Sequence, residues 1–333
     1  MISSLLNGRA LSEKDAEAIF GRLVRGEMGE VEMTALLVGL KMAGETPSVI
    51  AGAARALRAA ALPFDAGLDV ADSCGTGGDG AHTFNVSTVV ALVVAECGVR
   101  VAKHGNRSIS SKCGSADVLE ALGIGIETSP EVARRALHET GICYLHAPAY
   151  HAGLRHAATV RRALGVGTIL NLLGPLVNPA RPRWQVVGVY DPRWCVPMAE
   201  TLGRLGCERA LVVHGGGLDE VAPHAPTTAA FLSDGEVREM TIHPADVGLP
   251  SHDLAALAGG DAETNARILR ELLEGRGKEA QMAAVALNAG ALLMVAGKAG
   301  DLREGVASAR AVLRSDRGWQ RLQAWREVQR GAR

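Results

Sequence analysis

A run of glycines between a short apolar strand and a helix constrains the fold of this 333-residue chain more than any other feature. The run, GTGGDG over 75–80, follows the predicted strand Val70–Ser73 and precedes a predicted helix over Val86–Cys97. From there onward, short apolar runs alternate with helical segments, as is typical of α/β domains. Glycines number 40 while aromatic residues make up only 3%, so many tight backbone turns are expected.

The first sixty residues predict helices only. Ser12 followed three residues later by Asp15 resembles a capping box, and Thr46 before Pro47 predicts the first turn of another helix. This pattern breaks over 61–69. The predicted fold class is therefore α/β, with a small all-helical N-terminal domain over 1–65 and a larger α/β domain over 66–333 with a central, mostly parallel sheet. A helical segment near 155–175 is expected to join the small domain.

The remaining predicted elements of the larger domain alternate in the same way. The strands are Arg100–Lys103, Gln185–Tyr190 and Arg209–His214, and the helices are Ala116–Leu122, Pro130–Glu139, Ala262–Leu273 and Gln281–Ala296. Arginines at helical intervals near the C-terminus predict a solvated helix face rather than a nucleic-acid patch: Arg310, Arg314, Arg317, Arg321, Arg326 and Arg330.

Composition excludes several classes of partner. The formal net charge is -1, from 35 Lys+Arg against 36 Asp+Glu, so bulk electrostatics do not recruit nucleic acid. The six cysteines form no C-x-x-C pair, which favours reduced thiols in a cytoplasmic protein. The N-terminus lacks a signal-peptide pattern, and the strongest apolar run, Val89–Ala95, is far shorter than a membrane span.

The glycine run is the first candidate site. Glycines let successive backbone N–H groups turn inward as an anion nest, and the start of the following helix adds further donors, so both elements suit a phosphate. A glycine-rich loop alone is also typical of an ordinary turn. The pattern matches neither G-x-x-x-x-G-K-[ST] nor G-x-G-x-x-G, which disfavours nucleoside triphosphatases and dinucleotide-binding proteins.

The second candidate site is KHGNRSISS over 103–111, after the next predicted strand. It is followed by Gly114-Ser-Ala-Asp117, where Ser115 is expected to be the N-cap of a helix. Ligands of open α/β sheets bind at strand ends, and this segment places a lysine, an imidazole, an amide, a guanidinium and hydroxyls there. Alone, Lys103 or Arg107 would be a surface charge and His104 a buried structural histidine.

The third candidate site is the pair Asp219-Glu220, after the predicted strand Arg209–His214 and a glycine turn. Magnesium commonly takes one or two carboxylates together with waters and substrate phosphate oxygens. In isolation, however, two adjacent acidic residues would usually form a solvated turn.

Together these motifs are similar to those of the anthranilate phosphoribosyltransferase family. The resemblance rests on GTGGDG, TFNVST, KHGNRSISSKCGSADVLEALG, LLGPLVNPA and the leader segment KMAGETPSVIAG, and it covers nearly the whole chain. It implies a nucleoside phosphorylase/phosphoribosyltransferase-like fold and a homodimer that pairs through the helical domains. It also implies a magnesium-dependent pentosyltransferase of tryptophan biosynthesis, whose substrates are 5-phosphoribosyl 1-diphosphate and anthranilate.

The resemblance also implies roles for individual residues. Anthranilate would contact Gly75, His104, Asn106, His151 and Arg161, and magnesium would be held by Ser87, Asp219 and Glu220. Residues expected to bind 5-phosphoribosyl 1-diphosphate are Gly75, Gly78, Asp79, Thr83, Asn85, Val86, Ser87, Thr88, Lys103, His104, Gly105, Asn106, Arg107, Ser108, Ile109, Ser110, Ser111 and Ser115.

No general base is assigned, because the aromatic amine is already neutral at pH 7. Stabilising a leaving pyrophosphate and an oxocarbenium-like ribosyl centre requires mainly positioning and charge. Arg161 is expected to face the carboxylate of the acceptor, because a planar guanidinium pairs with that group through two hydrogen bonds.

The chain departs from the family pattern on the acceptor side. The family usually has Arg-Thr-x-Phe-Asn where this chain has Gly167-Thr-Ile-Leu170-Asn, and APxxHPAM where it has APAYHAGL around His151. A paralogue acting on a different aromatic acceptor is therefore the main alternative. A noncatalytic nucleic-acid-binding relative is a further alternative, and it is disfavoured by the intact phosphate motifs and the near-zero charge. The signatures of pyrimidine nucleoside phosphorylases are absent.

Overall fold

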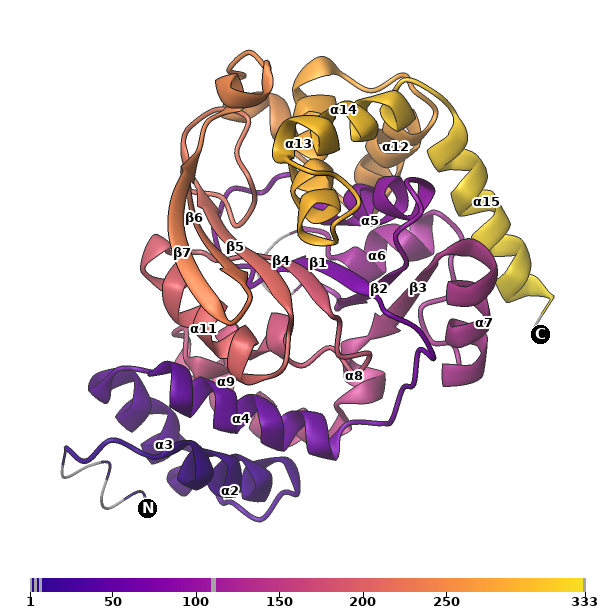
Figure 1. Cartoon of the computed structure of the whole chain (residues 1–333). Helices are drawn as coiled ribbons and strands as arrows, with labels where there is room; N and C mark the ends of the chain where they lie inside the picture. Colours follow the sequence, from indigo (N-terminus) through magenta and orange to yellow (C-terminus); the bar gives the residue numbers. More distant parts are fainter. Residues whose placement is uncertain (1, 3–4, 6–7, 109–111, 332–333) are drawn as a thin grey trace.

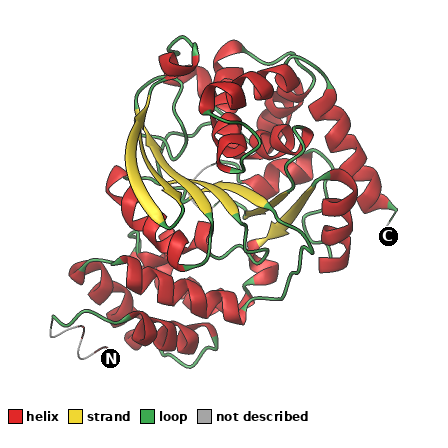
Figure 2. Ribbon diagram, viewed as in Figure 1, coloured by secondary structure: helices red, strands yellow, loops and turns green. Residues whose placement is uncertain are grey.

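The computed structural model describes residues 2, 5, 8–108 and 112–331. A central sheet lies between a layer of helices on one face and, on the other, a helix together with the N-terminal helical module (Figure 1). Figure 2 shows the strands as a twisted middle layer of the molecule. The predicted combination of an all-helical N-terminal part with a mostly parallel sheet is confirmed.

Among the described residues, the N-terminal module contains helices α2 (Glu13–Val24), α3 (Glu30–Ala43) and α4 (Pro47–Ala60). Both predicted helix starts are confirmed. Ser12 and Asp15 form a capping box, and the Thr46 hydroxyl accepts from the Val49 N–H at 3.4 Å. Two later helices, α9 (Ala158–Leu164) and α10 (Ile169–Leu173), pack against α3 and α4.

The sheet has seven strands in the order β3-β2-β1-β4-β5-β6-β7. The first five strands in that order are mutually parallel. Strand β6 pairs antiparallel with β5, and β7 pairs antiparallel with β6. The strands are β1 (Ala71–Gly75), β2 (Val101–Gly105), β3 (Ile142–His146), β4 (Trp184–Gly188), β5 (Arg209–Gly215), β6 (Thr227–Ser233) and β7 (Glu236–Ile242). The chain adds β2 and β3 on one side of β1 and then adds β4 on the other side. The order in which strands are added therefore reverses between β1 and β4. Open α/β sheets bind ligands at the carboxyl ends of strands at such a reversal.

Two hydrophobic cores fill the faces of the sheet. One includes side chains of α5, α7, α13 and α14 together with residues of β1–β3. The other joins α11 and the N-terminal module to the residues of β4–β6 on the opposite face of the sheet, so the module has no core separate from the sheet. Helix α13 is buried on nearly all sides, which its mostly apolar sequence permits.

The other helices of the larger part are α5 (Val86–Glu96), α6 (Ser115–Ala121), α7 (Pro130–Thr140), α8 (Ala147–Tyr150), α11 (Cys195–Arg204), α12 (Ala262–Leu273), α13 (Glu279–Val295), α14 (Leu302–Leu313) and α15 (Arg317–Arg330). Short 3₁₀ helices are η1 (Ala152–Ala157), η2 (Gly174–Leu176), η3 (Pro192–Trp194), η4 (Pro244–Val247) and η5 (Leu254–Leu257). Of the helices in the described ranges, none combines the length and apolar character needed to cross a bilayer.

Three strands were not predicted. Strand β3 is short and fully buried, so it carries no alternation of polar and apolar residues. Strands β6 and β7 form a hairpin around Asp234 and Gly235, both with positive φ. The dipeptide Asp-Gly between two strand-like runs is a strong hairpin signal and could have located them.

Two local expectations were wrong. The N-cap of α6 is Gly114, and Ser115 is the first helical residue, because Asp117 accepts from the Gly114 N–H and so closes the first turn. The C-terminal arginines do not form one solvated face, since they lie on two helices. Arg321 pairs with Glu96 at 2.7 Å and donates to the Thr140 carbonyl, so it ties α15 to the helices beside the sheet.

Candidate active site at the carboxyl ends of β1, β2, β4 and β5

Glycines end the strands at the point where the sheet reverses. Gly75 ends β1 and is the register partner of Gly188, which ends β4. A β-carbon on Gly75 would lie 2.1 Å from the Asp219 carboxylate, and one on Gly188 would lie 1.5 Å from the Asp219 carbonyl oxygen. Only glycine therefore allows the Asp219-Glu220 turn to rest directly on the strand ends.

The acidic turn meets the glycine run on β1. The Asp219 carboxylate accepts from the Gly77 N–H at 2.8 Å, and the Asp219 N–H reaches the Asp79 carboxylate at 3.4 Å. Burial, together with the neighbouring Asp79 charge, raises the pKa of Asp219 to about 7. Burial and the Asp219 charge also raise the pKa of Glu220 well above its usual range. Ionising Asp219 and Glu220 together is therefore unfavourable, and a bound cation would offset that cost.

Lys103 reaches the same place from β2. Its ammonium group donates to the Ser73 carbonyl at 2.8 Å and to the Ser87 hydroxyl at 3.1 Å, and the side chain is buried. The Ser87 N–H, at the start of α5, hydrogen-bonds to Glu220 and lowers the pKa of that carboxyl, opposing the effect of burial. The three candidate sites from the sequence therefore converge at Ser87, Lys103 and Glu220.

Free backbone donors remain in the glycine run. Within the described part of the chain, the N–H groups of Gly78, Asp79 and Gly80 have no hydrogen-bond acceptor. Gly78 has φ +83, a conformation that L side chains rarely adopt. The run therefore has N–H groups that could bind an anion, as an anion nest requires.

Other residues of the predicted donor site serve the local structure. Thr83 bridges to Ala258, and the Asn85 carboxamide donates to the Cys113 carbonyl at 3.1 Å and accepts from Asn265 at 2.9 Å. Val86 and Thr88 are buried in the first turn of α5. These bonds fix the start of α5 relative to the segment that follows β2.

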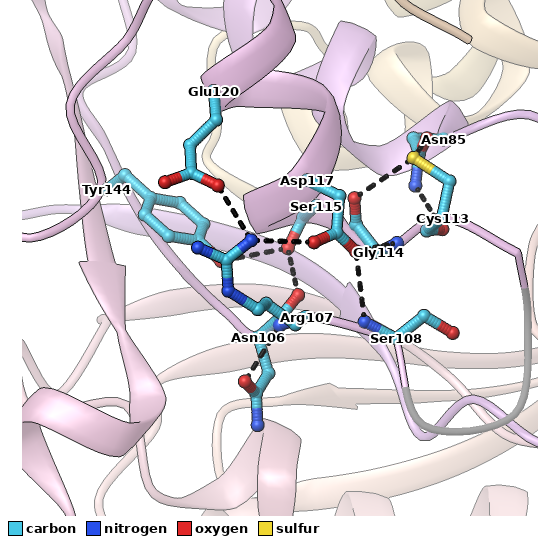
Figure 3. Close-up of polar contacts among 10 residues, drawn as sticks. All are labelled: Asn85, Asn106, Arg107, Ser108, Cys113, Gly114, Ser115, Asp117, Glu120 and Tyr144. Carbon is cyan, nitrogen blue, oxygen red and sulfur yellow. Dashed lines mark hydrogen bonds and ion pairs between the residues drawn. The ribbon is translucent and has the colours of Figure 1, made fainter. Parts of the chain in front are cut away.

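The segment after β2 is organised by Asp117 (Figure 3). Its carboxylate accepts from the N–H groups of Ser108 at 3.2 Å and Gly114 at 2.8 Å, and it pairs with Arg107 at 2.9 Å. Arg107 also pairs with Glu120, and both acidic side chains raise its pKa. Both ends of the segment are thereby anchored to the first turn of α6.

The predicted residues Ile109, Ser110 and Ser111 lie outside the described residues. Ser115 contacts the Tyr144 hydroxyl at 3.1 Å and the Asn106 carbonyl at 3.3 Å. The Asn106 carboxamide oxygen accepts from the Arg107 N–H at 2.7 Å, and the carboxamide extends to the side away from Asp117 (Figure 3). A β-carbon on Gly105 would lie 2.2 Å from the Ser115 hydroxyl, so Gly105 is required for this approach.

Two buried histidines lie next to the strand ends. The rings of His104 and His151 meet edge-to-face with centroids 5.3 Å apart. His104 Nδ1 donates to the Gly174 carbonyl at 3.2 Å and His151 Nε2 to the Val177 carbonyl at 2.8 Å. Burial lowers the pKa of His104 to about 3 and also lowers that of His151. The buried His104 Nε2 has no hydrogen-bond partner in the described structure.

Arg161 lies on α9 and is half-buried. Burial lowers its pKa, and its guanidinium makes no hydrogen bond or ion pair with any described residue, including His104, Asn106 and His151. Nearby, Gly167 is exposed and a β-carbon there would meet nothing within 4 Å. Leu170 is buried in the core shared with the helical module. The departure at 170 thus changes packing, and the departure at 167 opens space.

Reasoning from the sequence missed several supporting residues. Asn178 donates to the buried Asp72 carboxylate and to the Ala102 carbonyl, both at 2.8 Å, and so ties β1 to β2 behind the glycine run. Asn288 on α13 binds the main chain of Val221, next to the acidic pair. Both are buried asparagines in apolar surroundings, a pattern that indicates a specific hydrogen-bonding role.

The acidic turn suits a magnesium ion that is only partly held by protein. Within the described ranges, no three acidic, histidine or cysteine side chains converge closely enough to form a complete metal site. Magnesium usually binds through one or two carboxylates and keeps waters or substrate phosphate oxygens as its other ligands. Asp219 and Glu220 are adjacent carboxylates with raised pKa values, and Lys103 acts on Glu220, so the pair fits that requirement.

Comparison with known proteins places the chain in a family. The description "Glycosyl transferase family, helical bundle domain" matches residues 1–61, and "Glycosyl transferase family, a/b domain" matches residues 67–318. The anthranilate phosphoribosyltransferase of Sorangium cellulosum is 58% identical over 97% of this chain and 93% of its own length.

Two solved structures share the fold. Anthranilate phosphoribosyltransferase from Thermus thermophilus is 44% identical, with a TM-score of 0.95 over 99% of each chain. The Saccharomyces cerevisiae enzyme in complex with PRPP and Mg is 25% identical, with a TM-score of 0.88 over 99% of this chain and 97% of that chain. From this identity over nearly its full length, the chain belongs to the anthranilate phosphoribosyltransferase family.

Proposed function

We infer that this chain transfers the 5-phosphoribosyl group of 5-phosphoribosyl 1-diphosphate to anthranilate, giving N-(5-phosphoribosyl)anthranilate and pyrophosphate, a step of tryptophan biosynthesis. One observation supports this most strongly. The unbonded N–H groups of 78–80, the buried Lys103 and the Asp219-Glu220 turn meet at the strand ends where the sheet reverses. Such a site holds a diphosphate without any net positive charge on the protein.

The donor would lie between the glycine run and the segment after β2. Gly78 and Asp79 offer main-chain N–H groups to the diphosphate, and Lys103 offers a buried cation. Asn106 presents its carboxamide on the side away from Asp117 (Figure 3). Hydrogen bonds to a charged group contribute about 1.5–3 kcal/mol each, so three or four of them suffice for tight binding.

Ser87, Asp219 and Glu220 would hold magnesium together with the diphosphate. Bound there, the ion supplies positive charge that stabilises the leaving pyrophosphate. The chain itself contributes the orientation. Gly75 and Gly188 seat the acidic turn on the strand ends, and Lys103 fixes the Ser87 hydroxyl beside it.

The acceptor would lie beside the His104 and His151 rings. Arg161 has no ionic partner among the described residues, which leaves its guanidinium for the carboxylate of anthranilate. Neither histidine is assigned as a general base, because the aromatic amine is already neutral and burial, by lowering the pKa of both rings, makes them weak bases. Catalysis then depends on positioning and on stabilising charge.

The test is an assay of purified protein with magnesium, 5-phosphoribosyl 1-diphosphate and anthranilate. We expect loss of anthranilate fluorescence and release of an equal amount of pyrophosphate. Turnover of another aromatic acceptor but not of anthranilate would instead support a paralogous phosphoribosyltransferase. That second candidate rests on Gly167 and Leu170, where the family usually has Arg and Phe.

The metal assignment is tested separately with Asp219→Asn combined with Glu220→Gln. We expect magnesium-dependent turnover to fall strongly while the KM for anthranilate changes little, because the two side chains face the diphosphate. An unchanged magnesium dependence would refute this assignment.

The partner we propose is a second copy of this chain, bound through α3. Val31 is 86% and Met42 83% exposed on that helix, and they line a hollow of about 790 Å³ with Val38 and Ala35. Large exposed apolar patches usually mark interaction sites. Sedimentation velocity should give a dimer, and Met42→Glu should give a monomer.

We also propose that the protein is cytoplasmic and binds neither nucleic acid nor membranes. The six cysteines, all within the described ranges, form no disulfide. The net charge of -1 also gives no general attraction for polyanions.

A further inference from the structure

A buried asparagine of α13 grips the chain directly after the acidic pair. The Asn288 carboxamide oxygen accepts from the Val221 N–H at 2.8 Å, and its nitrogen donates to the Val221 carbonyl at 3.0 Å. The nitrogen also donates to the Ala284 carbonyl one turn earlier in α13, at 2.9 Å. Both donor hydrogens and the acceptor of this side chain are therefore used.

The asparagine is an exception in its surroundings. Helix α13 is otherwise almost wholly apolar where it is buried, and Asn288 and Val221 are both inaccessible to solvent. Burying a carboxamide is favourable only when its hydrogen bonds are made. A leucine would suit this core better, so the hydrogen bonds to Val221 indicate a specific requirement.

That requirement concerns the two residues before Val221. On the other side of the acidic pair, Leu218 exchanges main-chain hydrogen bonds with Gly215 at 2.9 and 3.0 Å. Asp219 and Glu220 are thus the only residues between a main-chain tether to β5 and the Asn288 clamp. With both ends held, the main chain of Asp219 and Glu220 has little freedom, which limits the directions that their carboxylates can take.

We propose that Asn288 is a positioning residue for the metal site, holding Val221 so that Asp219 and Glu220 face the glycine run. This rests on the proposed role of that acidic pair. Replacing groups that orient metal ligands typically weakens metal binding by about 10–100-fold. Asn288 does not touch the metal or the substrate itself.

The chain contains a matched control. Gln329 on α15 makes the same kind of clamp, accepting from the Gly125 N–H at 2.8 Å and donating to the Gly125 carbonyl at 3.0 Å. It is also buried, but it holds the segment between α6 and α7, away from the acidic turn. Asn288→Leu and Gln329→Leu therefore each remove a pair of hydrogen bonds to the main chain of one residue, at different places, and Asn288→Leu also removes the bond to Ala284.

The experiment measures Mn²⁺ binding by electron paramagnetic resonance, with and without inorganic pyrophosphate, and the magnesium dependence of turnover. Asn288→Leu should weaken Mn²⁺ binding by about tenfold or more. It should also raise the magnesium concentration needed for activity, with the KM for anthranilate unchanged. Gln329→Leu should leave Mn²⁺ binding unchanged while lowering the melting temperature comparably.

A second variant guards against misfolding. In Asn288→Ser, the hydroxyl can bond back to the Ala284 carbonyl but cannot pair with both groups of Val221. It should weaken Mn²⁺ binding in the same direction. Wild-type Mn²⁺ affinity in both folded Asn288 variants would overturn this inference alone. No binding by the wild type above the level of the Asp219→Asn/Glu220→Gln protein would overturn the proposed metal site and this inference with it.

Discussion

The donor side and the acceptor side of the site are built in different ways. On the donor side, Gly188 lies against the main chain of Asp219 and Gly75 against its carboxylate, so Asp219 is closely confined. On the acceptor side, Arg161 pairs with none of the residues that the structure describes, and Gly167 borders open space. If the proposed sites are right, the difference teaches that phosphate binding depends on backbone geometry, while acceptor binding depends on a few side chains that can be exchanged.

The largest effect should come from adding one methyl group on the donor side. In Gly188→Ala the new β-carbon would lie 1.5 Å from the Asp219 carbonyl oxygen, so the acidic turn must shift. A misplacement of about 1 Å can lower the rate about 100-fold. Gly167→Ala, where a β-carbon meets nothing, is the matched control and should retain full activity. Equal activities in steady-state assays would break the comparison.

The acceptor side should respond to loss of a single cation. Arg161→Ala should raise the KM for anthranilate about 10- to 100-fold, because each hydrogen bond to a charged group contributes about 1.5–3 kcal/mol. The exposed neighbour Arg162 provides the control, since Arg162→Ala should change neither substrate constant. A selective rise in the KM for 5-phosphoribosyl 1-diphosphate would assign Arg161 to the donor side.

Asp117 sharpens the donor side further. Asp117→Ala removes the acceptor for the Ser108 and Gly114 N–H groups, so the segment carrying Asn106 loses its anchor. We expect the KM for 5-phosphoribosyl 1-diphosphate to rise about tenfold, the equivalent of one net hydrogen bond. Glu120→Gln, which only weakens an exposed ion pair with Arg107, should have little effect. If both variants behaved alike, the ion pair and not the main-chain anchor would matter.

The smallest effect is expected where the chain departs from its family. Gly167→Arg should change stability by no more than about 0.5 kcal/mol, as surface substitutions usually do. The exposed position has room for the longer side chain. Thermal unfolding checks the stability, and an acceptor screen shows whether the added guanidinium shifts acceptor preference. A large destabilisation would show that the acceptor side is as tightly packed as the donor side.

Local patterns predicted much of the fold. The capping residues Ser12 and Thr46 located helix starts because a side-chain oxygen satisfies the free N–H groups of a first turn wherever the helix lies. Strand β3 and the hairpin of β6 and β7 were missed. The first lacks polar alternation because it is buried throughout, and the turn signal at Asp234-Gly235 went unused.

Only part of the candidate site could be predicted from local sequence patterns. Three motifs could be found because the chemistry of a diphosphate and a cation requires glycines, a lysine and carboxylates in short segments. Asn178 and Asn288 could not be assigned roles, since each acts on residues more than 60 positions away in the chain. Gly188 could not be assigned a role either, because the need for glycine there follows from its contact with Asp219.

By itself, the sequence determined the α/β class, the helical leader and the residue types that meet a sugar diphosphate, because these depend on neighbours within a few positions. Only the tertiary structure decided that the sheet reverses between β1 and β4, that Asp219 rests on Gly75 and Gly188, and that Asn288 holds Val221. Those features arise from strand order and packing, which bring distant segments within van der Waals contact and leave no periodic trace along the chain.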